Sequence, residues 1–358
     1  MKVLHVTNSL SEGGVETLIV QMLPELSDRN IEVELLVLNK KKTSLITLLE
    51  TKGVKVHVGK YNNIYNPFNI LLICKYLKKN DIIHSHLFPI QYYTIIAKYI
   101  TWSKIKCVTT EHGSYNNRRK YLLFKILDKL FLRKYDKVVC VSNSAYSSLT
   151  SWIGTLSNIT IIYNGIPIDK FKNIKPYPLS YWSLDNNCII VTMVARFFQA
   201  KDHITAIYAM QYLPENIHLF FVGSGETVVK FKKIAKDLKL NTRIHFLMKR
   251  YDIPQILSSS DICLLASHGE GLSISILEYM AANKPVIGSD VDGVRDILKD
   301  VGLLYRHKDP KDLADKILSI ANNKRMYLQI QNKCYTEIQK YSFENFISKY
   351  IEVYSSLI

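Results

Sequence analysis

The chain has 358 residues, of which 47% are hydrophobic and 22% are charged, a composition typical of a folded globular protein and not of a disordered one. Its 47 lysines and arginines against 31 acidic residues give a net charge of +16, and such an excess attracts a polyanion, whether a nucleic acid, an anionic lipid or a phosphorylated substrate. The length is about twice that of a typical domain of ~150 residues, so we expect two domains, each with its own core.

The sequence shows no sign of a membrane-spanning or secreted segment. No stretch approaches ~20 consecutive apolar residues, and the opening MKVLHVTNSL has too short an apolar run for a signal peptide. The six scattered cysteines form no CxxC pair, so we expect reduced, buried thiols in the cytoplasm and no metal site.

Short apolar runs rich in β-branched residues recur along the chain, separated by segments with helical spacing. In the first half they lie at 2–7, 31–38, 54–58, 81–86, 107–112, 137–142 and 159–165. In the second half they lie at 188–196, 217–223, 243–247, 262–267, 285–290 and 302–305. Alternating strands and helices predict parallel sheets covered on both faces. The predicted fold class is therefore α/β, with two doubly wound, Rossmann-like domains in tandem.

The domain boundaries follow from a break in this alternation. Residues 164–187 carry three prolines and no clear period, and we interpret them as the linker. We expect an N-terminal domain at 1–167, a C-terminal domain at 168–340, and a last helix at 341–358 that packs back on the N-terminal domain. Such sheets bind ligands at the carboxyl ends of their strands, so the expected site is the cleft between the domains.

The segment SHGEGLSISILEYMAANKPVIGSD (267–290) holds two glutamates eight positions apart. Glu270 lies in a glycine-rich turn after a predicted strand, and Glu278 lies just over one turn into the following helix, which Asn283 is expected to end in a left-handed conformation. Amides at a helix start favour an anion, so one ligand with hydroxyls at both ends and a phosphate between would engage all three features. The structural alternative is that Glu270 favours the helix start and Glu278 pairs with a lysine.

Two loops of the first domain also follow predicted strands. Gly13 and Gly14 open a helix and would present amides to a phosphate. His112 and Gly113 lie at the carboxyl end of a strand, where the alternative is a purely structural histidine.

Two loops of the second domain do the same. Arg196 and Lys201 place two cations between a strand and a helix, and the alternative is that both are simply solvated. Gly223 lies in the turn FVGSGE (221–226). All of these loops are predicted to face the same cleft, which packing alone does not explain.

In this order, the loops resemble those of the retaining, GT-B fold glycosyltransferases of family 4, the bacterial surface-polysaccharide type also known as group 1. The resemblance covers nearly the whole chain. Its markers are GGVE in the first loop, His112-Gly113, CVSNSA (140–145), YNGIPIDKF (163–171), VARFFQAKDH (194–203), FVGSGE, and Glu270-x7-Glu278 followed by PVIGSD.

The resemblance implies roles for these residues. Arg196 and Lys201 would hold the donor diphosphate, Glu270 would receive hydroxyls of the transferred sugar, and Glu278 would receive the ribose hydroxyls. His112 would contact the sugar near its reacting carbon. The other donor-binding residues would be the amides of Leu272, Ser273 and Ile274, with Gly13, Gly14, Gly223 and Arg250.

The family also implies the reaction. A hexose or N-acetylhexosamine would pass from a nucleotide-sugar, carried on UDP in preference to GDP, to a lipid-linked saccharide in capsule, exopolysaccharide or O-antigen synthesis. The family needs no metal and no cofactor. Asp290-Val291-Asp292 resembles the metal-binding DxD of the other glycosyltransferase fold, but it follows a strand of the second domain. Met248 stands where the family often has glycine, in a loop near the nucleobase, and Asp296 stands where glutamate is common.

Residues 118–137 interleave basic and large apolar side chains. The basic ones are Arg118, Arg119, Lys120, Lys125, Lys129, Arg133, Lys134 and Lys137, and the apolar ones are Leu122, Leu123, Phe124, Ile126, Leu127, Leu130, Phe131 and Leu132. A basic amphipathic helix suits an anionic membrane surface, which would make the enzyme cytoplasmic and peripheral at the inner face of the cytoplasmic membrane. The alternative is a core helix with a charged outer face.

Two other classes of function stay open. A non-catalytic polyanion-binding protein is suggested by charge alone, but the chain carries no nucleic-acid-binding signature, so we expect no nucleic acid partner. A nucleotide-sugar epimerase can share the two-domain fold, although the spacing of Glu270 and Glu278 does not favour it.

Overall fold

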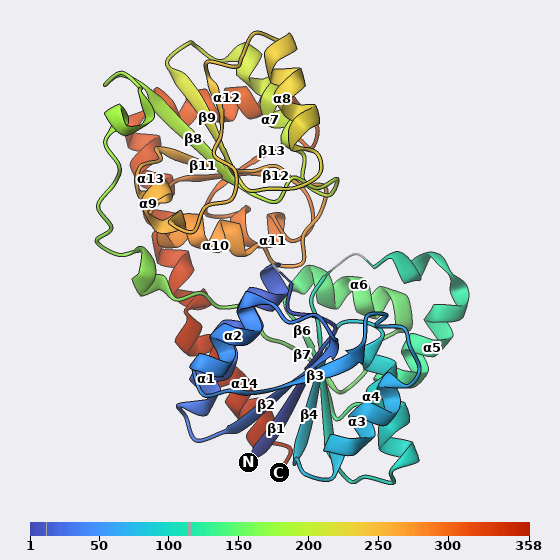
Figure 1. The fold of residues 1–358 in the computed structure, drawn as a ribbon. Coiled ribbons are helices and arrows are strands. Elements are labelled where there is room, and N and C mark those ends of the chain that lie inside the picture. The colour runs from blue at the N-terminus through green and yellow to red at the C-terminus, as the bar shows by residue number, and fades with distance from the viewer. Residues whose placement is uncertain (12, 114–115) are drawn as a thin grey trace. The chain divides into compact units, whose positions relative to one another are not determined.

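The computed structural model describes residues 1–11, 13–113 and 116–358. The chain forms two compact units (Figure 1): the first unit comprises Met1–Asn164 and Glu344–Ile358, and the second comprises Gly165–Phe343. The chain therefore passes from the first unit to the second after residue 164 and returns after residue 343, where the sequence predicts these boundaries at 167 and 340.

The first unit is built on a parallel sheet of seven strands in the order β3-β2-β1-β4-β5-β6-β7. Its strands are β1 (Lys2–Thr7), β2 (Glu32–Asn39), β3 (Lys55–Tyr61), β4 (Ile82–His86), β5 (Lys106–Glu111), β6 (Lys137–Cys140) and β7 (Ile159–Ile161). Its helices are α1 (Gly14–Ser27), α2 (Ser44–Thr51), α3 (Asn69–Leu77), α4 (Ile90–Ile100), η1 (Asn117–Lys120), α5 (Leu122–Leu132), α6 (Asn143–Ile153) and α14 (Phe343–Ser355).

The middle strands of this sheet form the core of the first unit. β4 is buried along its whole length, and β1 is buried from Val3 onward, as expected for parallel strands that are covered on both faces. The edge strands β3 and β7 are mostly half-buried. The strand order reverses between β1 and β4, so the carboxyl ends of these two strands are where a sheet of this kind binds ligands.

The second unit repeats the design with six strands in the order β10-β9-β8-β11-β12-β13. Its strands are β8 (Ile189–Val194), β9 (Ile217–Val222), β10 (Ile244–Phe246), β11 (Ile262–Leu265), β12 (Val286–Ser289) and β13 (Leu303–Tyr305). Its helices are η2 (Ile168–Phe171), η3 (Leu179–Trp182), α7 (His203–Ala209), η4 (Met210–Tyr212), α8 (Val228–Asp237), α9 (Ile253–Ser258), α10 (Ile274–Ala281), α11 (Arg295–Leu298), α12 (Pro310–Ala321), α13 (Lys324–Glu337) and η5 (Ile338–Tyr341). Here the order reverses between β8 and β11.

The predicted α/β class, with two doubly wound parallel sheets, is confirmed. Each predicted strand is present, although several end earlier than predicted because their last residues turn into loops. The strand predicted at 107–112 ends at Glu111, for example, so His112 is the first residue of the loop. Asn283 takes the predicted left-handed conformation after α10, with φ of 56°.

Residues 164–187, which we interpret as the linker, contain the crossing from the first unit to the second between Asn164 and Gly165. From Gly165 onward they belong to the second unit, where the Ser258 hydroxyl donates to the Ile174 carbonyl and the Tyr177 amide donates to the Ser259 hydroxyl, both at 2.7 Å. Apart from the short helices η2 and η3, this proline-containing segment has no regular structure and finds hydrogen-bond partners in the second unit. The last helix, α14, packs in the first unit, where Tyr354 is fully buried.

Residues 118–137 do not form one amphipathic helix, which corrects one prediction. They divide into η1, α5 and the turn before β6. Arg118 is buried, and its Nε donates to both carboxylate oxygens of Asp128 at 3.1 Å, so it belongs to the core and not to a membrane-facing surface. Several large apolar side chains here are exposed instead, namely Tyr121, Leu122, Leu123, Ile126 and Leu130. Within the described ranges, no helix is long and apolar enough to cross a membrane.

Candidate active site

The loops after β8 and β11 lie side by side at the point where the second sheet reverses. A β-bridge joins Lys201 to Ser267, the Asp202 amide donates to the Ala266 carbonyl at 3.1 Å, and the His268 amide donates to the Ala200 carbonyl at 3.0 Å. Two loops that are more than 60 residues apart in sequence are thereby fixed together. This contact is what brings the predicted cation of one loop to the predicted carboxylate of the other.

Lys201 and Glu270 form an ion pair at this junction. Their side chains are only 21% and 14% exposed, so the pair is shielded from water more than a surface salt bridge is. The backbone of Glu270 is held as well, since its amide donates to the Asp292 carbonyl at 3.1 Å. Gly293, with φ of 77°, approaches so closely that a Cβ there would lie 2.2 Å from the Glu270 carbonyl oxygen. The loop can therefore take this shape only with glycine at 293.

Glu278 is the acid of this site whose pKa is raised by burial. It lies on α10 with its side chain half-buried, and burial raises the pKa of its carboxyl to about 7. No described residue forms a hydrogen bond or ion pair with its carboxylate, so the lysine partner of the structural alternative is not found. A carboxyl with a raised pKa and no partner in the protein is a candidate for a functional site, because hydroxyls of a ligand could bond to it.

The start of α10 lies between these two acids. Ser273 caps the helix, with its hydroxyl accepting from the Ile276 amide at 3.4 Å, and both Leu272 and Ser273 are buried. The first amides of a helix have no carbonyl partner within it, so those of Leu272, Ser273 and Ile274 are suited to an anion. The structure thus places a helix start between the two acids, and its binding of an anion stays a prediction.

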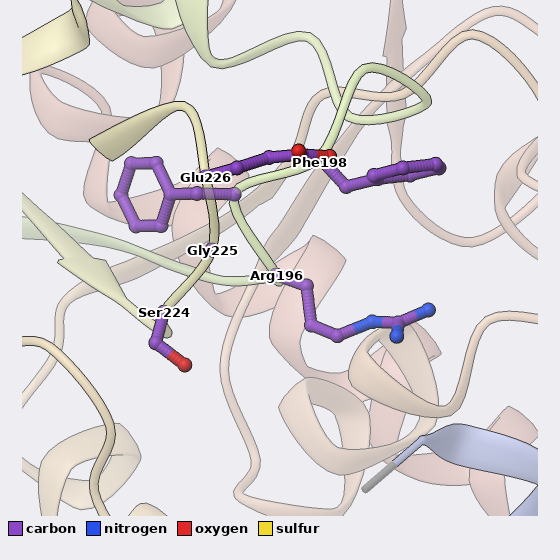
Figure 2. A pocket seen from close by; sticks show the side chains of 6 residues that line it. Arg196, Phe198, Ser224, Gly225 and Glu226 are labelled. Atoms are coloured by element: carbon purple, nitrogen blue, oxygen red, sulfur yellow. The ribbon is translucent and has the colours of Figure 1, made fainter. Parts of the chain in front are cut away.

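Arg196 lines a cavity of about 230 Å³ beside this junction (Figure 2). The other lining residues come from the loops after β8 and β9, namely Phe197, Phe198, Ser224, Gly225 and Glu226. The Arg196 side chain is exposed, and in the described part of the chain its guanidinium forms no ion pair or hydrogen bond. Arg196 is therefore a cation available to a ligand, whereas Lys201 is already paired.

Gly223 has a structural reason to be glycine. A Cβ at this position would lie 2.1 Å from the Ala195 carbonyl oxygen, so the turn after β9 can pack against the loop after β8 only without a side chain. Its amide donates to the Met248 carbonyl at 2.8 Å. Met248 itself has φ of 55°, which explains why glycine suits this position better than methionine.

Arg250 is held by its own unit. Its guanidinium makes a two-pronged contact with Asp252, at 2.8 Å from Nε and 2.5 Å from Nη2, and it lies 5.9 Å from the Trp182 ring. The hydrogen bonds from Arg250 hold the pKa of the Asp252 carboxyl far below its usual range. A ligand would therefore meet Arg250 as part of this cluster and not as a free cation.

The first unit contributes a different set of groups. Gly13 precedes α1 and Gly14 begins it, so their amides lie at a helix start, as predicted. His112 follows β5 and is partly exposed, and its Nε2 lies 3.1 Å from Nδ1 of the buried His86. Burial lowers the pKa of His112 to about 4, so its ring is neutral at pH 7.

Among the residues that the structure describes, two groups of side chains are close enough to one another to hold a cation: His5, His84 and His86, and Asp202, His268 and His307. In the first group each of the ring nitrogens already has a hydrogen-bond partner. In the second group both Asp202 oxygens accept from Thr205. Neither group presents a free set of ligand atoms.

Asp290 and Asp292, which resemble a DxD motif, are bonded to Arg295. Its Nε donates to Asp290 at 2.5 Å and its Nη1 donates to Asp292 at 3.3 Å. Both carboxylates therefore face a cation of the protein. Arg295 was not among the predicted site residues. It begins α11 three residues after Asp292 and five after Asp290, and this short separation in sequence is a signal that could have identified it.

The residues that surround His112 were also overlooked. His86 contacts it directly, and behind His86 lie His5 and Tyr354. The signal was present in the segment HSH (84–86), because polar side chains two apart in a strand that is otherwise apolar share one face and need partners there. No feature of the sequence around Tyr354 predicts that it contacts these histidines.

Two parallel, doubly wound sheets with glycine-rich and charged loops after their strands define the architecture of the GT-B glycosyltransferases. The model described as "Glycosyltransferase Family 4" matches residues 12–170, and the model "Glycosyl transferases group 1" matches residues 182–337. Together they span nearly the whole chain, which therefore belongs to the group 1 glycosyltransferases of the GT-B fold.

Known proteins of this family match over most of their length. An O-antigen biosynthesis glycosyltransferase of Escherichia coli, WclY, is 24% identical over 100% of this chain and 99% of its own. A UDP-Gal:α-D-GlcNAc-diphosphoundecaprenol α-1,3-galactosyltransferase of Escherichia coli is 26% identical over 74% of this chain and 73% of its own. The crystal structure of Anabaena Alr3699/HepE in complex with UDP and glucose superimposes with a TM-score of 0.87, at 20% identity over 99% of this chain and 100% of that one.

Proposed function

We propose that this glycosyltransferase moves a hexose or N-acetylhexosamine, with retention of configuration, from a nucleotide-sugar to a lipid-linked saccharide acceptor in bacterial surface-polysaccharide synthesis. UDP is the proposed carrier. The observation that carries the proposal is Glu278, a desolvated carboxyl without a described partner, close in sequence to an anion-suited helix start and to the Lys201–Glu270 pair. The names of the two Escherichia coli relatives support the pathway and the acceptor class, and the UDP complex of the Anabaena protein supports the carrier.

The proposed roles of the residues are those that the resemblance to the family implies, and the chemistry of each side chain supports them. Glu278 accepts hydrogen bonds from the two ribose hydroxyls, and the amides at the start of α10 receive the diphosphate. Glu270 accepts from hydroxyls of the transferred sugar, and this contact competes with its bond to Lys201. Lys201 can then turn to the diphosphate together with Arg196, which is exposed already. His112, neutral at pH 7, contacts the sugar near its reacting carbon.

The chemistry that these groups support is loss of a nucleoside diphosphate. Retaining transfer passes through positive charge at the anomeric carbon, while negative charge grows on the departing phosphate. Fixed cations and helix amides stabilise that negative charge without having to reorganise. Arg196, Lys201 and α10 supply these groups, so we propose that no metal ion is required. The leaving phosphate itself takes the proton of the acceptor hydroxyl.

The proposal is tested in two stages. A thermal-shift screen of UDP-glucose, UDP-galactose, UDP-N-acetylglucosamine and GDP-mannose should show stabilisation by UDP-sugars, because a ligand that binds only the folded state raises its stability. The stabilising donor is then incubated with an undecaprenyl-diphosphate-linked sugar, and the product is identified by mass. Conversion of the donor to an isomer without any acceptor would instead identify an epimerase, and stabilisation by RNA alone would identify a polyanion-binding protein.

We further propose that α5 docks the enzyme on an anionic membrane, where a lipid-linked acceptor resides. The supporting observation is that four leucine and isoleucine side chains of α5 are exposed and not packed in the core: Leu122 is 72%, Leu123 65%, Ile126 64% and Leu130 54% exposed. Exposed basic side chains lie among them, namely Lys120, Lys125, Lys129, Arg133 and Lys134. Exposed apolar groups interleaved with cations suit the boundary between acyl chains and anionic headgroups.

The test replaces Lys125, Lys129 and Arg133 with glutamine and leaves the buried Arg118 in place. Binding to phosphatidylglycerol vesicles at low salt should weaken at least about tenfold, because each basic residue near such a surface contributes about 1 kcal/mol. The matched control replaces Lys230, Lys233 and Lys236 of α8, which removes the same charge from the second unit. If the control weakens binding as much, or if the wild-type protein ignores these vesicles, the docking proposal is wrong.

A further inference from the structure

A buried chain of hydrogen bonds connects His112 to the last helix of the protein. His5 lies on β1, His84 and His86 lie on β4, and His112 follows β5. These three strands are neighbours in the sheet, with His5 directly opposite His84. Because residues two apart in a strand point to the same face, the imidazoles gather on one side of the sheet, and α14 brings Tyr354 to them.

The contacts form one continuous path. Nε2 of His112 lies 3.1 Å from Nδ1 of His86, and Nε2 of His86 lies 3.1 Å from Nδ1 of His5. Nε2 of His5 lies 3.4 Å from the Tyr354 hydroxyl, which also lies 2.6 Å from Nδ1 of His84. His5, His84 and His86 are at most 1% exposed, so His112 is the one ring of the four that solvent or a ligand can reach.

All four imidazoles are neutral, which forces the chain to have a direction. Burial lowers the pKa of His5 to about 3 and that of His112 to about 4, and it lowers the pKa values of His84 and His86 far below their usual range. A neutral imidazole carries one N–H donor and one bare nitrogen. If one ring donates toward Tyr354, every ring between Tyr354 and His112 has to donate in the same sense.

Tyr354 decides which sense this is. Its hydroxyl has one proton and two imidazole neighbours, and a phenol is a stronger acid than a neutral imidazole N–H. The proton therefore lies in the short contact, where Tyr354 donates to Nδ1 of His84 at 2.6 Å. The longer contact is then a donation from Nε2 of His5 to the phenol oxygen. It follows that His86 donates to His5 and that His112 donates from Nε2 to His86, which leaves Nδ1 of His112 bare.

We propose that His86, His5 and Tyr354 are positioning residues that hold His112 in the Nε2–H tautomer, with Nδ1 as an acceptor for a hydroxyl of the transferred sugar. Nδ1 is buried, and the described residues supply no partner for it, which is costly for a polar atom. The ring is partly exposed, and a sugar hydroxyl that reaches Nδ1 would supply the missing hydrogen bond. This inference rests on the proposed function, because that function places a sugar at His112.

The tautomer is tested on the free protein, independently of any activity. Two-bond proton–nitrogen correlation spectra of the full chain, labelled in its 10 histidines, distinguish protonated from bare ring nitrogens, and His112→Gln identifies the resonances of His112. We expect a proton on Nε2 and none on Nδ1. In Tyr354→Phe, which removes only the hydroxyl, we expect this single tautomer to give way to a mixture. A proton on Nδ1 of wild-type His112 would overturn the proposal.

The effect on the reaction needs a matched variant. Tyr350 is also buried on α14, but its hydroxyl contacts Thr110, whose hydroxyl lies 2.8 Å from Nε2 of His84, so it joins the network beyond Tyr354 and not between Tyr354 and His112. With UDP-glucose, UDP-galactose and UDP-N-acetylglucosamine as donors, Tyr354→Phe should lower kcat about threefold to tenfold, the loss expected for one weakened neutral hydrogen bond. UDP affinity should not change, and Tyr350→Phe should stay within about twofold of wild type.

Equal losses of kcat in the two variants would show that Tyr354 acts only as part of the core, and would overturn the positioning role. If no donor is turned over by the wild-type protein, the proposed function fails, and the spectra of the free protein still decide the tautomer. The two failures are therefore distinguishable.

Discussion

The carboxyl group of Glu278 should destabilise the free protein above neutral pH, and Glu278→Gln should relieve this destabilisation. Burial raises the pKa of this carboxyl from 4.5 to about 7. A raised pKa in the folded state means that the unfolded chain loses its proton first, so stability falls as the pH rises through this range. Below pH 4.5 the carboxyl is protonated in both states and the cost is absent.

The size of the effect follows from the two pKa values. The difference between 4.5 and about 7 corresponds to roughly 3 kcal/mol at pH 8.5, at about 1.36 kcal/mol for each tenfold change in proton affinity. At pH 4.5 the same arithmetic leaves about 0.4 kcal/mol. Glutamine keeps the shape of the side chain and cannot ionise, so Glu278→Gln should be more stable than wild type by these amounts.

Thermal unfolding of the wild-type protein and of Glu278→Gln at pH 4.5 and pH 8.5 measures this difference in stability. For a unit of this size, about 3 kcal/mol corresponds to a rise in Tm of about 6–12 °C. The control is Glu215→Gln, which neutralises an exposed carboxyl of the same unit and should change stability by less than about 0.5 kcal/mol at both pH values. If Glu278→Gln gives no larger gain at pH 8.5 than at pH 4.5, the carboxyl is not desolvated and the argument for a ligand-seeking acid is wrong.

Three further predictions concern the metal, the core and the active-site loop. Transfer should survive EDTA, because Asp290 and Asp292 are bonded to Arg295; loss of activity with EDTA and its rescue by Mn²⁺ would contradict this. Asp128→Ala should lower the free energy of unfolding by about 3–5 kcal/mol, because it removes the closer carboxylate of the buried Arg118 and leaves only Glu111, at 3.8 Å, as its ion-pair partner among the described residues, and a change below about 1 kcal/mol in urea unfolding would refute it. Gly293→Ala should abolish transfer and destabilise the protein more than Gly154→Ala, which has φ of 84° but open space around its Cβ position; equal losses in the two variants would show that the approach to Glu270 is unimportant.

The fold could be predicted because its signal is local and repeated. Apolar runs of strand length alternate with helical segments. Each strand and the helix that follows it can be recognised from their own residues, without knowledge of the rest of the fold. The pairing of Glu270 with Lys201 could not be predicted, although both residues were identified as site residues. It depends on the β-bridge between Lys201 and Ser267, which exists only once β8 and β11 are neighbours in the sheet.

Two residues of the first unit were misjudged or missed because their partners, too, come close only in the folded chain. Arg118 was grouped with membrane-facing cations because its sequence neighbours are basic, but its environment is set by Asp128 and by the aromatic ring of Phe88, 4.9 Å away. Tyr354 has no local feature that points to His5, from which it is separated by nearly the whole chain. Charge and periodicity identify elements, whereas burial and partners are properties of the folded chain.

Calorimetric titration of UDP into the wild-type protein, Glu278→Ala and Glu270→Ala tests the account most directly. Glu278→Ala should weaken UDP binding about tenfold to a hundredfold, since hydrogen bonds to a charged group contribute about 1.5–3 kcal/mol. Glu270→Ala should leave UDP affinity unchanged or slightly tighter, because it releases Lys201, while turnover of the UDP-sugar is lost. Equal weakening in both variants, or no binding of UDP to the wild-type protein, would contradict the assignment of Glu278 to the nucleotide and of Glu270 to the transferred sugar.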